Sequence, residues 1–168
     1  MENVFRPYKK ESFKYKKPQK QEKLMEGYLM TKIINSTAKL LEEFRISVDN
    51  GRFHCVCLDL PPELGTDRGP TALELGVMSF AGCISQIFYL MSKKMRVSVS
   101  ALEVNVKAEK PDDTKTVTKA DIEIKVTTNE SEDKIKRVWQ HTRDNCPVGQ
   151  LFEGAGIPVN YNLKIIKK

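Results

Sequence analysis

Two cysteines that lie far apart in the sequence are the residues best suited to chemistry. Cys83 lies in FAGCIS, inside the apolar segment LELGVMSFAGCISQIFYLM, residues 73–91. Cys146 lies in NCPVGQLF, where a proline follows it immediately. A cysteine thiolate is a strong nucleophile, and it is oxidised reversibly through a sulfenic acid to a disulfide. The pair therefore suggests thiol redox chemistry, provided that folding brings the two sulfurs together.

The surroundings of the two cysteines predict different acidities. Asn145 ends one helical pattern and Pro147 suits the first position of a new helix, so Cys146 is expected at an N-cap beside unpaired backbone N–H groups. Such a position lowers the pKa of a thiol. Apolar neighbours of Cys83, such as Phe80, raise the pKa of a thiol by desolvation. On this local argument Cys146 is the more acidic of the two.

A structural interpretation of both cysteines is equally simple. Free cysteine is among the most buried residue types, and most buried cysteines are unreactive. The spacing alone favours this interpretation, so the residues by themselves leave both possibilities open.

The other candidate residues indicate a function less clearly. Cys55 and Cys57 fall on one face of a strand while His54 points to the opposite face, so these three residues are not expected to bind zinc. We interpret the two cysteines as facing the sheet, and we predict no metal. His141 lies near the carboxyl end of its predicted helix, where the helix dipole favours a histidine. It is either a surface residue or a local base near Cys146.

The basic charge is concentrated at the amino terminus. Residues 1–23 hold eight Lys or Arg against three Glu, which accounts for +5 of the net charge of +6 over 168 residues. We predict a flexible basic arm at residues 1–23, which is interpreted as solvated instead of as a nucleic-acid-binding segment. Residues 24–168 are predicted to form a single domain. The first residues contain no apolar run resembling a secretion signal, so a cytoplasmic location is expected.

Alternating apolar residues predict the strands. Two strands are expected on either side of a two-residue turn at Asn50-Gly51, two more around residues 102–106 and 122–126, and a closing strand around 159–165. The order β-β-α-β-β-α-β predicts an α+β fold in which an antiparallel sheet is covered by helices.

Capping signals mark where the helices begin. Thr71 and Glu74 fit a capping box at the start of the long apolar helix, and Ser131 precedes the second helix. Residues 73–91 are apolar on every face, which is typical of a helix enclosed on all sides. Because one sheet covers only one side, we predict a homodimer in which a second copy covers the rest. A membrane span is not expected, because polar residues interrupt the segment.

The motifs together resemble a known family. GPTALELGVMSFAGC, followed some sixty residues later by NCPV, with strands before and after, is similar to the OsmC/Ohr superfamily of osmotically inducible and organic-hydroperoxide-resistance proteins, over residues 38–166. The resemblance implies an intertwined homodimer built around a long central helix. It also implies a thiol peroxidase in which Cys83 is the peroxidatic residue and Cys146 the resolving residue.

The implied reaction needs an organic hydroperoxide and an external dithiol reductant, and no metal or organic cofactor. The alternative is a non-enzymatic dimer of the same fold that binds a small molecule or serves as a scaffold, with its cysteines merely packed.

One feature departs from the family pattern. In hydroperoxide-reducing members a glutamate ten residues before the first cysteine pairs with an arginine that stabilises the thiolate, but here that position is Leu73. Glu74 lies nine residues before Cys83, so it points away from that thiol on a continuous helix, and a capping role is expected for it.

The family's arginine also has no clear counterpart. The arginines that precede the helix match no family spacing: Arg45, Arg52 and Arg68.

Overall fold

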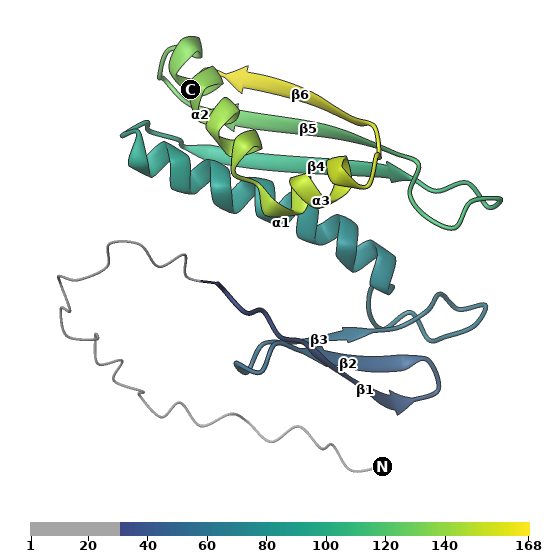
Figure 1. Cartoon of the computed structure of the whole chain (residues 1–168). Coiled ribbons are helices and arrows are strands. Elements are labelled where there is room, and N and C mark those ends of the chain that lie inside the picture. Colours follow the sequence, from purple (N-terminus) through teal and green to yellow (C-terminus); the bar gives the residue numbers. More distant parts are fainter. Residues whose placement is uncertain (1–30) are drawn as a thin grey trace, which may run out of the picture. The chain divides into compact units, whose positions relative to one another are not determined.

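The computed structural model describes residues 31–168, and residues 35–168 form one compact unit. The predicted arm, residues 1–23, and the predicted domain start at residue 24 lie outside the described residues. The fold is of the α+β class, as expected, with three helices and two small sheets in the described part of the chain (Figure 1). In chain order the elements are β1 (Thr37–Glu42), β2 (Arg45–Asp49), β3 (Cys55–Leu58), α1 (Ala72–Lys94), β4 (Ala101–Glu109), β5 (Lys119–Thr127), α2 (Glu132–Asp144), α3 (Pro147–Gly154) and β6 (Val159–Ile166).

The first sheet is an antiparallel meander with the order β1-β2-β3. The predicted two-residue turn at Asn50-Gly51 is wrong, because β3 begins only at Cys55. Side chains at the end of β2 explain the longer loop. Asp49 accepts a hydrogen bond from the Gly51 N–H and Asn50 accepts one from the Arg52 N–H, which stabilises local turns in place of ladder hydrogen bonds.

The second sheet has the order β4-β5-β6, and its strands are not all antiparallel. β4 pairs with β5 in the antiparallel sense, whereas β5 pairs with β6 in parallel, with Ile122 opposite Tyr161 and Ile124 opposite Leu163. The prediction of an antiparallel sheet is therefore wrong for β6. The reason is the connection: α2 and α3 form a crossover, and such a crossover returns the chain parallel to the strand that it left.

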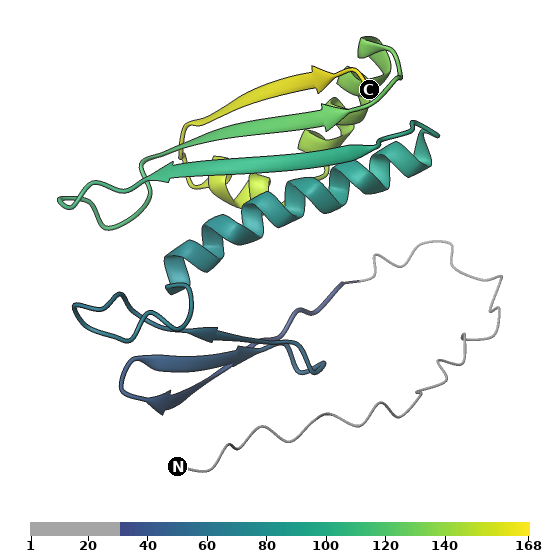
Figure 2. The ribbon, with the colours of Figure 1, turned by 180° about the vertical axis from the view of Figure 1, so that it is seen from behind.

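The three helices lie on one face of the second sheet, which is seen from its other side in Figure 2. Its inward side chains alternate along β5, where every second residue from Ala120 to Thr128 is buried, while the outward ones are charged or polar. The core combines this face with residues from α1 and α2: Phe80, Ile84, Phe88, Ile122, Ile124, Val126, Ile135 and Val138.

Helix α1 is buried along one stripe only. Its buried residues, Phe80, Ile84, Phe88 and Ser92, recur every four positions, while Met78 is 56% exposed and Tyr89 is 51% exposed. The expectation of a helix enclosed on all sides is therefore not met within a single chain. By length and composition this is the one helix in the described residues that could cross a membrane, but its buried stripe packs against the core of the domain.

The helix begins where the capping box predicts. Thr71 accepts from the Glu74 N–H, and the Glu74 carboxylate accepts from the Thr71 N–H at 2.7 Å. Thr71 is the last residue of a loop that starts at Asp59, and the Asp59 N–H donates to the Pro70 carbonyl, which closes the loop. The loop therefore delivers the chain directly to the first turn of α1.

Asp59 holds this loop together from inside. Its carboxylate is 2% exposed and accepts hydrogen bonds from the Thr66 hydroxyl and from the backbone N–H groups of Leu60, Thr66 and Arg68. The Thr66 hydroxyl, followed by the backbone donors and opposed by burial, lowers the pKa of Asp59 to about 2.

We expect Asp59→Asn to lower the thermal midpoint, because an amide nitrogen would face N–H donors. The pKa of Asp59 is lower in the folded chain than in the unfolded one, so its contribution is complete above pH 3.8 and is lost as the pH falls through about 2. The difference in midpoint between wild type and variant, measured by circular dichroism, should therefore be constant near neutral pH and shrink towards pH 2. Asp67→Asn, an exposed change in the same loop, is the control and should change little. A pH-independent difference would contradict this role.

Candidate active site

Helices α1 and α3 bring the two cysteines together. Cys83 lies near the middle of α1, and Cys146 lies at the N-cap of α3, as its sequence context predicts. The Cys146 thiol donates a hydrogen bond to Cys83 Sγ, and the two sulfurs are 3.1 Å apart. A disulfide needs an S–S distance of about 2.05 Å. A further approach of about 1 Å would therefore join them, although both are free thiols here.

The packing of α3 against α1 determines this distance. The rings of Phe152 and Phe80 lie 4.6 Å apart between their centroids, which fastens the short helix to the long one. Gly149 is buried at the contact, and a Cβ atom there would lie 3.3 Å from the Phe80 ring and 3.4 Å from Cys146 Sγ. A Cβ at this position would therefore be tightly packed, and the Phe80 ring or Cys146 would have to shift by a few tenths of an ångström to admit it.

The two thiols differ in exposure. Cys83 is partly exposed, whereas Cys146 is 2% exposed and lies within the core. A small molecule that reaches the pair from solvent therefore meets Cys83 first.

The expected low pKa of Cys146 is wrong. The Gly149 N–H does donate to Cys146 Sγ at 3.4 Å, as the N-cap prediction requires, and this lowers the pKa of that thiol. Burial acts more strongly in the opposite direction, and with the hydrogen bond to Cys83 it raises the pKa of Cys146 to about 12. At neutral pH Cys146 therefore keeps its proton and acts as the hydrogen-bond donor of the pair.

No cation of residues 31–168 hydrogen-bonds either thiol. Glu74 is occupied by the capping box, as expected, and Arg45 forms an ion pair with Glu42. Arg68 contributes its backbone N–H to the Asp59 loop. Among residues 31–168, the side-chain hydrogen bond to Cys83 Sγ therefore comes from the Cys146 thiol.

A polar cluster, which we call the clasp, holds the carboxyl end of α3 to β6 and α2. It consists of Arg143, Glu153 and Tyr161. The Tyr161 hydroxyl donates to Glu153 at 2.9 Å, and the Arg143 guanidinium lies 3.7 Å from the same carboxylate and 4.8 Å above the Tyr161 ring. Trp139 contacts the edge of this ring from α2. The clasp thus connects β6 to the helix that begins with Cys146.

The remaining candidate residues lie apart from this pair. Cys55 Sγ is 3.0 Å from the Ser47 hydroxyl, and His54 Nδ1 is 3.2 Å from the Asn50 amide. His141 is exposed on α2, in agreement with the surface interpretation. Among residues 31–168, no three His, Cys, Asp or Glu side chains are grouped as a metal ion requires.

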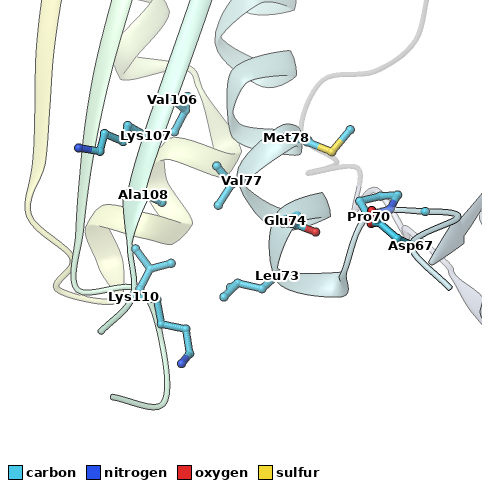
Figure 3. A pocket seen from close by; sticks show the side chains of 12 residues that line it. Asp67, Pro70, Leu73, Glu74, Val77, Met78, Val106, Lys107, Ala108 and Lys110 are labelled. Carbon is cyan, nitrogen blue, oxygen red and sulfur yellow. The ribbon is translucent and has the colours of Figure 1, made fainter. Parts of the chain in front are cut away.

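An apolar groove of about 750 Å³ runs between the first turns of α1 and the end of β4 (Figure 3). Leu73 and Val77 face Ala108 across it, and Lys107 and Lys110 lie along the strand side. Val77 and Cys83 are six residues apart, which separates their side chains by about 120° around the helix axis and about 9 Å along it. The groove and the thiol pair are therefore separate features of α1.

The family model for OsmC-like protein matches residues 65–162, which include the apolar helix and both cysteines. The chain therefore belongs to the OsmC-like family, as the motifs suggested. No curated protein matches its sequence.

Solved structures have the same fold. The OsmC-like protein from Mycoplasma pneumoniae has a TM-score of 0.73 at 20% identity, and the match covers 82% of this chain and 99% of that chain. An organic hydroperoxide resistance protein from Elizabethkingia anophelis has a TM-score of 0.63 at 12% identity, covering 84% and 100%. The organic hydroperoxide resistance protein OsmC from Legionella pneumophila has a TM-score of 0.57 at 13% identity, covering 83% and 99%. At these identities the likeness establishes the fold alone.

Sequence reasoning missed Gly149 and the clasp. A glycine three residues after an N-cap cysteine is a usable signal, because the backbone N–H at that position caps the sulfur. The clasp had no comparable signal, since Tyr161 reads as one more apolar position of an alternating strand.

We expect mild oxidation with diamide to form one disulfide, between Cys83 and Cys146, because their sulfurs already lie 3.1 Å apart. Intact mass should fall by two hydrogens, and peptide mapping should join the two cysteine peptides. Cys146→Ser is the control and should not show this crosslink. A crosslink between Cys55 and Cys57 alone would contradict the geometry.

Proposed function

We propose that the protein is a thiol-dependent peroxidase that reduces organic hydroperoxides, with Cys83 as the peroxidatic residue and Cys146 as the resolving residue. The observation that carries the proposal is the contact of a partly exposed thiol with a buried one at 3.1 Å. A packed structural pair has no need of an exposed member, whereas a peroxidase needs one sulfur that the oxidant reaches and a second that captures the product.

The reaction balances with these two sulfurs and one external reductant. The Cys83 thiolate attacks the terminal oxygen of R–O–O–H, the O–O bond breaks, and the alcohol leaves with a proton. The Cys146 thiol then loses its proton and attacks the sulfur of the Cys83 sulfenic acid. The S–S bond forms, the S–O bond breaks, and water leaves. An external dithiol reduces the disulfide by thiol–disulfide exchange, so no metal or organic cofactor is required.

The surroundings of Cys83 favour an apolar substrate. Phe80 and Phe88 are fully buried in the core and cannot line an open site. Leu90 lies about two turns after Cys83 on the same side of α1 and is 44% exposed. Two relatives of this fold are named organic hydroperoxide resistance proteins, which fits an alkyl peroxide. A reducing compartment such as the cytoplasm would supply the dithiol.

The test is peroxide consumption by reduced protein with cumene hydroperoxide and a dithiol. Cys83→Ser should fall to the rate of buffer with dithiol alone, because the attacking sulfur is gone. Cys146→Ser should turn over more slowly than wild type, because its sulfenic acid has to react with the external dithiol instead of with a neighbouring thiol. Cys55→Ser is the matched control and should retain the wild-type rate. Equal rates in all four proteins would eliminate the mechanism.

The same proposal includes a homodimer. Large apolar side chains are exposed on the uncovered face of α1, where Met78 is 56% and Tyr89 51% exposed. In the first sheet Leu40 is 70% exposed, and Phe44, in the turn between β1 and β2, is 47% exposed. Exposed large apolar side chains in this number usually mark an association site, and a second copy of the chain would bury them symmetrically.

We expect the protein to elute as a dimer in size-exclusion chromatography with light scattering. Met78→Asp should shift it towards the monomer, because a charge would be buried at the interface. Thr116→Asp adds the same charge at an exposed loop position and should leave the dimer unchanged. A wild-type monomer at micromolar concentration would contradict this part of the proposal.

A second function has one observation in its favour. The groove beside α1 is lined mainly by apolar side chains, with Lys110 at its edge, which suits a small amphipathic molecule (Figure 3). In a binding protein of this fold the cysteines would be merely packed, and hydroperoxide would leave the thiol count unchanged. The peroxide experiment above therefore separates the two functions.

A further inference from the structure

The thiol pair has a fixed member and an adjustable member. Cys83 lies inside a 23-residue helix whose stripe of Phe80, Ile84 and Phe88 is fully or almost fully buried. Cys146 lies at the start of α3, which is only eight residues long. Formation of the disulfide shortens the sulfur–sulfur distance by about 1 Å. Because a long packed helix resists displacement, we assign this movement to Cys146 and the short helix α3.

Two side-chain contacts determine the position of α3. Towards α1, Phe152 stacks on Phe80 at 4.6 Å. Towards β6, the adjacent residue Glu153 accepts the Tyr161 hydroxyl at 2.9 Å. The first contact holds α3 against α1 near Cys83. The second prevents α3 from rotating about the first contact. Without the second, the carboxyl end of α3 loses its side-chain hydrogen bond to β6 and depends on the apolar packing of Phe152.

The charges and the protonation state of the clasp residues stabilise the contact between α3 and β6. Burial, and then the bond to Glu153, raise the pKa of Tyr161, so the hydroxyl remains protonated and continues to donate. Arg143 lies over the ring and beside Glu153, so the carboxylate is held from two sides.

We propose that Tyr161, acting through Glu153 and supported by Arg143, is a positioning residue that keeps Cys146 within reach of the Cys83 sulfenic acid. The inference rests on the proposed function, because it concerns the second step of that reaction. The clasp makes the condensation effectively unimolecular by holding the resolving sulfur close to its target. It has no part in the first step, in which peroxide meets Cys83.

The test is Tyr161→Phe, which removes one hydroxyl and keeps the ring. In single-turnover experiments with one equivalent of cumene hydroperoxide, disulfide formation should slow by about tenfold, because a misplacement of 1 Å costs up to a hundredfold. Peroxide consumption in the same reaction should remain within about twofold of wild type, since Cys83 is untouched. Dimedone should correspondingly trap more sulfenic acid on Cys83 in the variant than in wild type.

Three further variants distinguish a positioning role from a general loss of rigidity. Glu153→Gln retains a carbonyl oxygen for the Tyr161 hydroxyl and should restore disulfide formation most of the way, whereas Glu153→Ala should behave like Tyr161→Phe. Asn160→Ala removes a hydrogen bond to Asp121 on the opposite face of β6 and should leave both steps at the wild-type rate. If Tyr161→Phe does not fold, Glu153→Ala gives the same measurement.

The outcomes separate the inference from the function on which it rests. A wild-type protein that forms no Cys83–Cys146 disulfide with peroxide would overturn the peroxidase proposal itself. A wild-type protein that does form it, with variants that partition between sulfenic acid and disulfide as wild type does, would overturn the role of the clasp alone. A parallel loss of both steps in Tyr161→Phe would also overturn it, because a positioning residue slows only the second.

Discussion

The contact between the short helix α3 and the middle of α1 is the constraint on which the candidate site depends. Stacking of Phe152 on Phe80 and the absence of a side chain at Gly149 allow the N-cap of one helix to approach the side of the other. The cysteine at that N-cap then lies 3.1 Å from a cysteine 63 positions earlier in the chain. The sheet, the crossover through α2 and the capping box of α1 all contribute by fixing where these two helices meet.

The chemistry of Cys146 shows how two local effects compete. An N-cap position stabilises a thiolate through a backbone N–H, and the hydrogen bond from Gly149 is present. At 3.4 Å it is a long bond, however, and the sulfur is almost completely removed from water. Desolvation penalises the charged form more than one long hydrogen bond favours it, so the thiol retains its proton. A helix terminus therefore activates a cysteine only where the sulfur remains partly solvated.

Local signals predicted the parts of this structure that local interactions determine. The capping box at Thr71, the N-cap at Cys146 and the α+β class all follow from short-range spacing, and the structure confirms them. The parallel pairing of β6, the one-sided burial of α1 and the acidity of Cys146 depend on contacts between distant segments or on exposure. The spacing of apolar residues in the sequence carries no information on long-range contacts or on exposure. An apolar helix surface, in particular, does not say whether the same chain or another one covers it.

The division of labour between a long and a short helix has a physical rationale. The residue that meets an oxidant benefits from a rigid position, because its approach path must remain open, and α1 supplies that rigidity through fully buried Phe80 and Phe88. The residue that completes a disulfide must move, since the two sulfurs have to close a gap of about 1 Å to form the bond. An eight-residue helix, anchored by a few contacts at its end, moves by 1 Å at far lower cost than a 23-residue core helix. Rigidity at Cys83 and adjustability at Cys146 are thus consequences of element length and burial.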